Sequence, residues 1–179
     1  MGSKLIRWVG AAIVGLGAVF GVGMATAVPV SAAGFSCPSD WQADTWQNTA
    51  NLNYLNVSGS GGSGAKVITW HSSSASPHTN EQWCLQRASE GGWYFHPKYN
   101  TGLCMDVQGA NYSSGAGIIV WTCNGRANQR FAVSVPPGQH NHVFCPTAHQ
   151  SLCVSQGGGD FGNQVILRSA SYDNYSFWF

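Results

Sequence analysis

Charged residues are scarce in this chain of 179 residues, where Lys, Arg, Asp and Glu together make up 8% of the sequence. Once Lys4 and Arg7 near the N-terminus are set aside, six basic residues remain against seven acidic ones, a net charge near −1. The sequence therefore offers no basic patch that could neutralise phosphates. We expect neither nucleic acid nor an anionic membrane surface as a partner.

Recognisable catalytic and metal-binding patterns are also lacking. The few acidic residues are scattered without a legible pair, and no Ser or Cys nucleophile has a base at motif spacing. His140 and His142, the two histidines closest to each other in the sequence, lie in a Gly/Pro-rich stretch without a carboxylate. The spacing of the cysteines matches no tetrahedral metal site. We expect no enzyme activity, no metal and no cofactor.

The only long apolar run lies at the N-terminus. Lys4 and Arg7 precede an apolar stretch over residues 8–30, which ends in the small residues Ser31-Ala32-Ala33. This order is typical of a secretory signal, here residues 1–33, and predicts a secreted protein without membrane contact after cleavage. An uncleaved anchor is the alternative, because the run is long enough to span a bilayer.

Residues 34–179 show no sustained helical periodicity. Their wealth of Gly, Ser, Asn, aromatic and β-branched residues indicates one loop-rich, all-β domain. All six cysteines lie in this part, and an even number in an exported chain predicts three disulfides, with fifteen possible connectivities. They are Cys37, Cys84, Cys104, Cys123, Cys145 and Cys153.

One pattern occurs three times in this domain: a short strand, a Gly/Ser-rich loop, a second strand and then an aromatic residue. Such a period predicts a repeat architecture, with repeats over approximately residues 34–83, 84–131 and 132–179. Three matched series recur every 47 to 51 residues: Asn56, Asp106 and Ser155; Trp70, Trp121 and Arg168; Trp83, Phe131 and Trp178.

Strand alternation predicts which side chains point outward. Arg168 would rarely be buried unpaired, so its counterparts Trp70 and Trp121 are expected to face solvent. The polar series that contains Asp106 marks the matching face of the neighbouring strand as exterior, so we expect Asp106 and Trp121 on the outer surface. The third series is always large and apolar and is expected in the core.

Three half-buried units must pack together around a pseudo-threefold axis. A further strand precedes each pattern, at residues 45–48, 93–96 and 142–145. About four strands in each repeat give about twelve in all, arranged as a closed barrel with capping hairpins that leaves no open sheet edge.

Repeat two carries Gly102-Leu103-Cys104-Met105-Asp106-Val107, then Gly115 to Cys123, then Asn128-Gln129-Arg130-Phe131. These residues resemble the ricin-B-type β-trefoil, the QxW lectin family that includes the family-13 carbohydrate-binding modules. The resemblance extends over essentially all of residues 34–179. It implies a β-trefoil fold and a lectin or stand-alone carbohydrate-binding module whose partner is a glycan or polysaccharide.

The resemblance also implies roles for residues of repeat two. Asp106 would accept hydrogen bonds from two sugar hydroxyls, Trp121 would stack on the apolar face of the ring, Asn128 would bind one hydroxyl, and Gln129 would steady Asp106. A carboxylate forms the stronger, charge-assisted hydrogen bonds. The sequence departs from the family at Ile119, where a polar residue is common, and this departure bears on selectivity.

The other two copies match these positions less well. Repeat one keeps Trp70 and Asn80 but has Asn56 for the aspartate and Glu81 for the glutamine, which implies a weaker second site. Repeat three loses the site, because it carries Ser155, Arg168, Tyr175 and Ser176 at the four positions.

The same resemblance implies a disulfide between Cys104 and Cys123. The matching partner of Cys153 would be Ala170, so we expect Cys145 as its partner instead, which leaves Cys37 with Cys84.

Two other interpretations stay open. Asp106 could cap a turn and Trp121 could cover the surface, although neither of the other copies has both residues, so the scaffold does not require them. The chain could also be a trefoil scaffold with a vestigial sugar site, which acts as a protein-binding factor, an inhibitor or a toxin.

Overall fold

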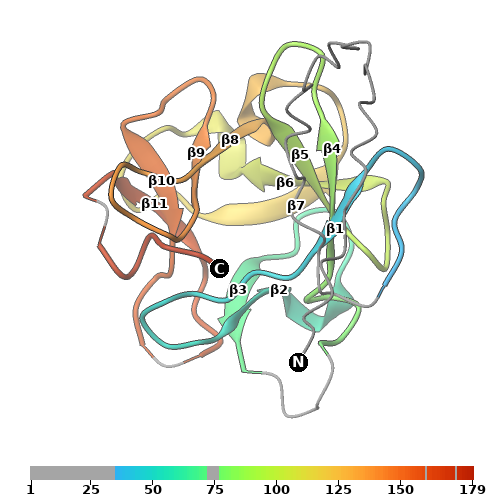
Figure 1. Cartoon of the computed structure of the whole chain (residues 1–179). Helices are drawn as coiled ribbons and strands as arrows, with labels where there is room; N and C mark the ends of the chain where they lie inside the picture. Colours follow the sequence, from blue (N-terminus) through green and yellow to red (C-terminus); the bar gives the residue numbers. More distant parts are fainter. Residues whose placement is uncertain (1–34, 72–76, 160, 172) are drawn as a thin grey trace, which may run out of the picture. The chain divides into compact units, whose positions relative to one another are not determined.

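The computed structural model describes residues 35–71, 77–159, 161–171 and 173–179, which excludes the expected signal segment. Eleven strands and three 3₁₀ turns are present in these residues (Figure 1). They are β1 (Gln42–Asp44), β2 (Tyr54–Val57), η1 (Ser58–Ser60), β3 (Val67–Trp70), β4 (Trp83–Arg87), β5 (Trp93–Pro97), β6 (Leu103–Val107), η2 (Gln108–Ala110), β7 (Ile118–Thr122), η3 (Ala127–Gln129), β8 (Phe131–Ser134), β9 (Val143–Pro146), β10 (Leu152–Ser155) and β11 (Ile166–Ser169).

Five strands form an antiparallel sheet in the order β1-β4-β5-β8-β9. The last residues of the chain connect its two edges, because Trp178 exchanges backbone hydrogen bonds with His142 beside β9 and Phe179 with Gln47 beyond β1. These last residues occupy the place of the twelfth expected strand. The predicted closed β-trefoil is confirmed.

The other six strands form three hairpins, β2–β3, β6–β7 and β10–β11, one from each repeat. A glycine N–H of each hairpin donates to a carbonyl of the next: Gly64 to Val120, Gly115 to Leu167, and Gly162 to Thr69. Each glycine has a positive φ, which a residue without Cβ adopts at no steric cost. The hairpins are thus joined in a ring around the pseudo-threefold axis.

The core lies where strands of all three repeats meet. Trp83, Phe131 and Trp178 are each fully buried, so the expected core series is confirmed. The Nε1–H groups of Trp83 and Trp178 donate to the carbonyls of Leu55 and Val154, on the first strand of each of their hairpins. Burial of the indoles therefore leaves neither donor unpaired.

Two expectations about strand positions and exposure are wrong. The first sheet strand is Gln42–Asp44 rather than residues 45–48, because Gln47 and Asn48 pair instead with Tyr54 and Trp178 in isolated bridges. Asp106, Asn56 and Ser155 are buried rather than exterior. In repeat two, η3 lies over this face of the hairpin and covers Asp106. In the part of the chain that the structure describes, no helix is long and apolar enough to cross a bilayer.

Three disulfides join Cys37 to Cys84, Cys104 to Cys123 and Cys145 to Cys153. These are the pairs that the sequence led us to expect. The Cys37–Cys84 bond attaches the N-terminal part of the domain to β4, and the Cys104–Cys123 bond links β6 to the residue that follows β7. Each closed loop reduces the entropy of the unfolded chain.

We expect the stability of the domain to depend on pH through Asp44. Burial raises the pKa of Asp44 to about 6 from 3.8, so the folded state disfavours the ionised carboxylate. Below about pH 3 the group is protonated in both states, and at pH 3.5 it is still mostly protonated in both. Between pH 4 and 6 it ionises first in the unfolded chain, and folding stability is lost as pH rises. Asp44→Asn removes this loss and should stabilise the protein by about 2 kcal/mol at pH 7.5, allowing for partial exposure, but not at pH 3.5.

Denaturant unfolding with the disulfides intact, at pH 3.5 and pH 7.5, measures this difference. Asp40→Asn, at an exposed carboxyl group a few residues away, is the matched control for the loss of a carboxylate in this segment. Equal stabilisation by Asp44→Asn at both pH values would contradict the prediction.

Candidate functional site

A pocket of about 460 Å³ opens on the outer side of the repeat-two hairpin. Asp106, Ile119, Trp121 and Asn128 line it. Cross-strand pairing sets Asp106 opposite Ile119 and Cys104 opposite Trp121. The side chains of these two pairs therefore share one face of the hairpin. The indole of Trp121 is 46% exposed while Asp106 is only 3% exposed, which places an open aromatic plate beside a recessed carboxylate.

The amides of η3 hold the Asp106 carboxylate. Asn128 Nδ2 donates to Oδ1 and Gln129 Nε2 to Oδ2, each at 2.9 Å. Burial raises the pKa of Asp106, and the hydrogen bonds from Gln129 and Asn128 partly offset this effect. Both oxygens are therefore oriented and retain lone pairs for a further donor.

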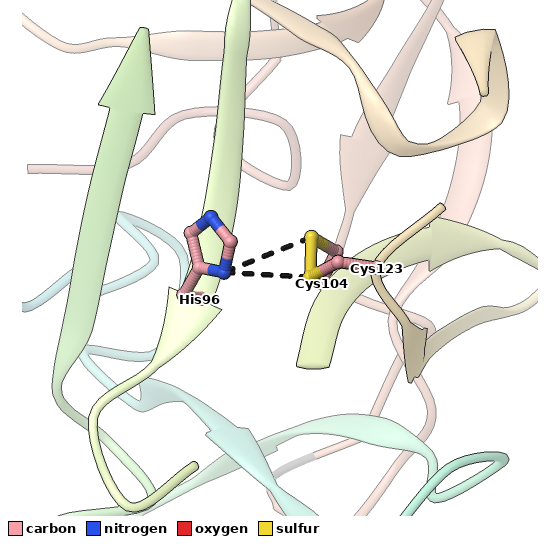
Figure 2. A group of neighbouring side chains, drawn as sticks. All are labelled: His96, Cys104 and Cys123. Atoms are coloured by element: carbon pink, nitrogen blue, oxygen red, sulfur yellow. Dashed lines mark hydrogen bonds between the residues drawn. A yellow bond between two sulfur atoms is a disulfide. The ribbon is translucent and has the colours of Figure 1, made fainter. Parts of the chain in front are cut away.

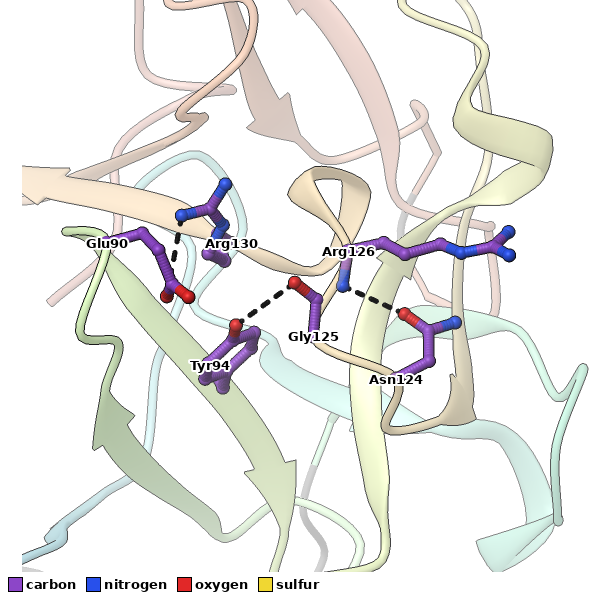
Figure 3. Close-up of polar contacts among 6 residues, drawn as sticks. All are labelled: Glu90, Tyr94, Asn124, Gly125, Arg126 and Arg130. Carbon is purple, nitrogen blue, oxygen red and sulfur yellow. Dashed lines mark hydrogen bonds and ion pairs between the residues drawn. The ribbon is translucent and has the colours of Figure 1, made fainter.

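A short loop before η3 determines where these amides lie. In Figure 3 the Arg126 N–H donates to Asn124 Oδ1 at 3.0 Å, and the Tyr94 hydroxyl donates to the Gly125 carbonyl at 3.4 Å. The Asn124 N–H donates to Gln129 Oε1 at 2.9 Å, which fixes the orientation of the Gln129 amide. Figure 3 also shows Arg130 of the same segment paired with Glu90 at 3.7 Å.

A loop of repeat one also belongs to this site, which the sequence alone did not indicate. Ser63 Oγ accepts a hydrogen bond from the Thr122 N–H at 3.0 Å, and Gly64 lines the pocket. A Cβ on Gly64 would lie 3.5 Å from the indole of Trp121. The exposed indole is therefore supported by the neighbouring repeat.

Repeat one contains a matching pocket of about 660 Å³ lined by Asn56, Trp70, Asn80 and Glu81, among others. Asn80 Nδ2 donates to Asn56 Oδ1 at 3.2 Å, as Asn128 does to Asp106. Asn56 Nδ2 in turn donates to Glu81 Oε1 at 3.1 Å. The amide and the carboxyl group have thus exchanged places. The neutral Asn56 stands at the position of Asp106, and the Glu81 carboxyl group lies behind it.

Repeat three brings together a different set of side chains. Ser155 and Ser176 are buried with their hydroxyls 2.7 Å apart, and the guanidinium of Arg168 lies 5.1 Å from the ring of Tyr175. Ser176 Oγ also donates to the Asp173 carboxylate at 3.2 Å. The residue at the position of Trp121 is Arg168, however, so in the described part of the chain no indole stands beside this carboxylate.

Within the described residues, one group of side chains has the spacing of metal ligands: His96, Cys104 and Cys123. Figure 2 shows His96 Nδ1 facing the bonded sulfurs, 3.7 Å from Cys104 Sγ and 3.4 Å from Cys123 Sγ. Because the sulfurs form a disulfide, neither is a thiolate, the form that binds metals. Cys104 is the cross-strand partner of Trp121, so this group belongs to the scaffold beside that residue.

Two family models match the chain. The ricin-type beta-trefoil lectin domain matches residues 93–179, and the ricin-type beta-trefoil lectin domain-like model matches residues 40–121. The two matches overlap and extend over nearly all of the described domain. No curated protein sequence matches the chain.

Solved structures share the fold at low identity. The designed three-fold symmetric protein ThreeFoil is 23% identical, with 76% of this chain and 95% of that chain covered and a TM-score of 0.68. For the ricin B-like lectin of Macrolepiota procera, solved with lactose, the values are 15%, 80%, 96% and 0.64. For an exo-beta-1,3-galactanase from Clostridium thermocellum they are 19%, 80%, 30% and 0.68, so this chain matches under a third of that enzyme.

Removal of one amide should change the ionisation of Asp106. Asn128→Ala deletes a hydrogen bond to the carboxylate, and we expect the pKa of Asp106 to rise further because the ionised form gains more from that donor than the protonated form does. Carboxyl ¹³C shifts recorded against pH measure the change. Asn111→Ala, at an exposed asparagine beyond η2, is the control. A lower or unchanged pKa in Asn128→Ala would show that this amide does not stabilise the charge.

Proposed function

Because the chain belongs to the ricin-type β-trefoil lectin family, we propose that it is a secreted carbohydrate-binding protein that acts mainly through repeat two. The observation that carries this proposal is the open indole of Trp121 beside the oriented carboxylate of Asp106 in one pocket. The three disulfides support secretion, because such bonds persist in oxidising compartments.

The chemistry of this pocket suits a pyranose. A sugar ring has an apolar C–H face that packs on an aromatic plate, and its hydroxyls require acceptors and donors. Asp106 would accept from two hydroxyls, Asn128 would contact one of them, and Gln129, which is fully buried, would act only by holding Asp106. Ile119 contributes an apolar side chain to the pocket lining, which favours a ring that presents no hydroxyl at that point.

Repeat one is proposed as the weaker second site, with Trp70 as the plate and Asn56 and Asn80 as polar contacts. Its pocket, of about 660 Å³, is larger than the pocket of about 460 Å³ in repeat two, but the group at the Asp106 position is a neutral amide. Hydrogen bonds to charged groups contribute more than neutral ones, so binding at repeat one should be weaker.

Binding, rather than catalysis, is the role that this family and these pockets support. In repeat two the single carboxylate of the pocket, Asp106, accepts hydrogen bonds from Asn128 and Gln129, and such an anchored group suits recognition of hydroxyls. A glycan array probed with the oxidised protein tests the proposal and identifies the sugar class. A blank array for well-folded protein would favour the alternative of a protein-binding scaffold.

Loss of either main contact in repeat two should weaken binding strongly. Removing a charged hydrogen-bond partner costs about 1.5–3 kcal/mol, so Asp106→Ala should lower affinity about 10- to 100-fold. Trp121→Ala should lower it by at least about tenfold through lost stacking. Calorimetry with the best array glycan measures both effects. Arg168→Ala, at the matching position of repeat three, is the control and should bind like wild type. Undiminished binding in both variants would reject this site.

The exchanged amide and carboxylate of repeat one allow a gain-of-affinity test. Asn56→Asp combined with Glu81→Gln recreates the arrangement of repeat two, and we expect about tenfold tighter binding at Trp70 because the charge then faces the ligand. The indole N–H signal of Trp70 in ¹H–¹⁵N spectra reports this site alone.

The single change Asn56→Asp is the matched control. It places two carboxylates side by side in a buried position and should lower stability instead of raising affinity. If the double variant binds no more tightly at Trp70 than wild type, the assignment of repeat one as a second site is wrong.

A further inference from the structure

The three copies differ at the residue before the glycine that joins neighbouring hairpins. That residue is Ser63 in repeat one, Ser114 in repeat two and Phe161 in repeat three. The N–H of the glycine that follows donates in each case to the carbonyl of the residue before Trp121, Arg168 or Trp70 in the neighbouring hairpin. We call the position of these three residues the platform position. The scaffold therefore accepts serine before this glycine, and phenylalanine is a departure found only beside Trp70.

Phe161 forms a second aromatic surface against Trp70, one of the residues that line the repeat-one pocket. Its ring lies 5.2 Å from that of Trp70 at an interplanar angle of 80° and 4.6 Å from the ring of His71. The rings of Trp70 and His71 are 5.5 Å apart and nearly parallel. Among the described residues, Trp121 has no such ring contact. Repeat two therefore presents one aromatic ring, whereas repeat one presents three aromatic rings in contact.

The exposure of these rings argues against a merely structural role. Phe161 is 50% exposed and Trp70 is 38% exposed, so neither ring buries the other. A phenylalanine that only stabilised the loop would be expected to bury its ring, since apolar burial is the source of such stabilisation. Two large exposed rings in contact, one of which lines a polar pocket, are instead typical of a ligand-binding surface.

We propose that repeat one binds a glycan of at least two sugar residues, with one ring on Trp70 and the adjacent ring on Phe161 and His71. The ring planes of Trp70 and Phe161 are close to perpendicular, which suits a glycan that bends at the glycosidic bond between its two sugar rings. The second ring would supply apolar contact that compensates for the neutral Asn56. This inference rests on the proposed function and specifies its ligand: repeat two accepts a single terminal residue, whereas repeat one requires an oligosaccharide.

Tryptophan indole N–H signals of the ¹⁵N-labelled protein follow both sites in one titration. Three pairs of probes compare one ring with two: methyl β-galactoside with lactose, methyl β-glucoside with cellobiose, and methyl β-xyloside with xylobiose. For at least one pair, we expect the disaccharide to bind at Trp70 about five- to tenfold more tightly than the methyl glycoside. At Trp121 the ratio should stay below about twofold.

Phe161→Ser introduces the residue that the other two copies carry at this position, so the loop should keep its backbone conformation. It should reduce the preference for the disaccharide at Trp70 to below about twofold and leave Trp121 unchanged. Phe161→Tyr, which keeps the ring, should retain the preference. This pattern would support a subsite for the second ring.

Three results would overturn the inference. One is a preference for the disaccharide at Trp70 that survives in Phe161→Ser. Another is tighter binding of both probes in that variant, which would show that Phe161 obstructs Trp70. The third is a response at Trp121 without any at Trp70, which would remove the second site but leave repeat two intact. If neither indole responds to any glycan that the array selects, the proposed function itself fails.

Discussion

The ring of hydrogen bonds between the three hairpins is the constraint on which both candidate sites depend. Gly64, Gly115 and Gly162 each bring a loop of one repeat against the platform strand of the next. Each platform residue is therefore flanked on one side by its own repeat and on the other by its neighbour. A candidate site in this fold is consequently built by two repeats, and a change in one loop would alter the surroundings of the platform residue in the adjacent copy.

Internal repetition explains why so much of the fold could be predicted from one sequence. The three matched series indicated the trefoil, the buried Trp83, Phe131 and Trp178, and the exposed Trp70 and Trp121, because a position that tolerates Arg168 cannot be core. Alternation along a strand was less informative for Asp106. It assigns a side chain to one face of a hairpin but does not show that a later segment, here η3, covers that face.

The contributions of neighbouring repeats could not be predicted for a related reason. Ser63 and Phe161 are distant in sequence from the tryptophans beside them, and only the order of the hairpins around the axis brings them together. A signal was nevertheless present in the sequence. Comparing the residue before each loop glycine gives Ser63, Ser114 and Phe161, and this difference identifies the copy in which the loop has an additional aromatic ring.

The polar groups show how the copies can diverge without loss of the fold. Each of the first two repeats keeps one carboxylate and one amide in contact below the platform, but in opposite order: Asp106 with Gln129, and Asn56 with Glu81. Either order satisfies the buried donors and acceptors, so the scaffold is indifferent to it. A ligand would distinguish the two orders, because it would meet the Asp106 carboxylate in repeat two and the Asn56 amide in repeat one. Stability therefore constrains the pair, whereas the order within the pair is free to set affinity.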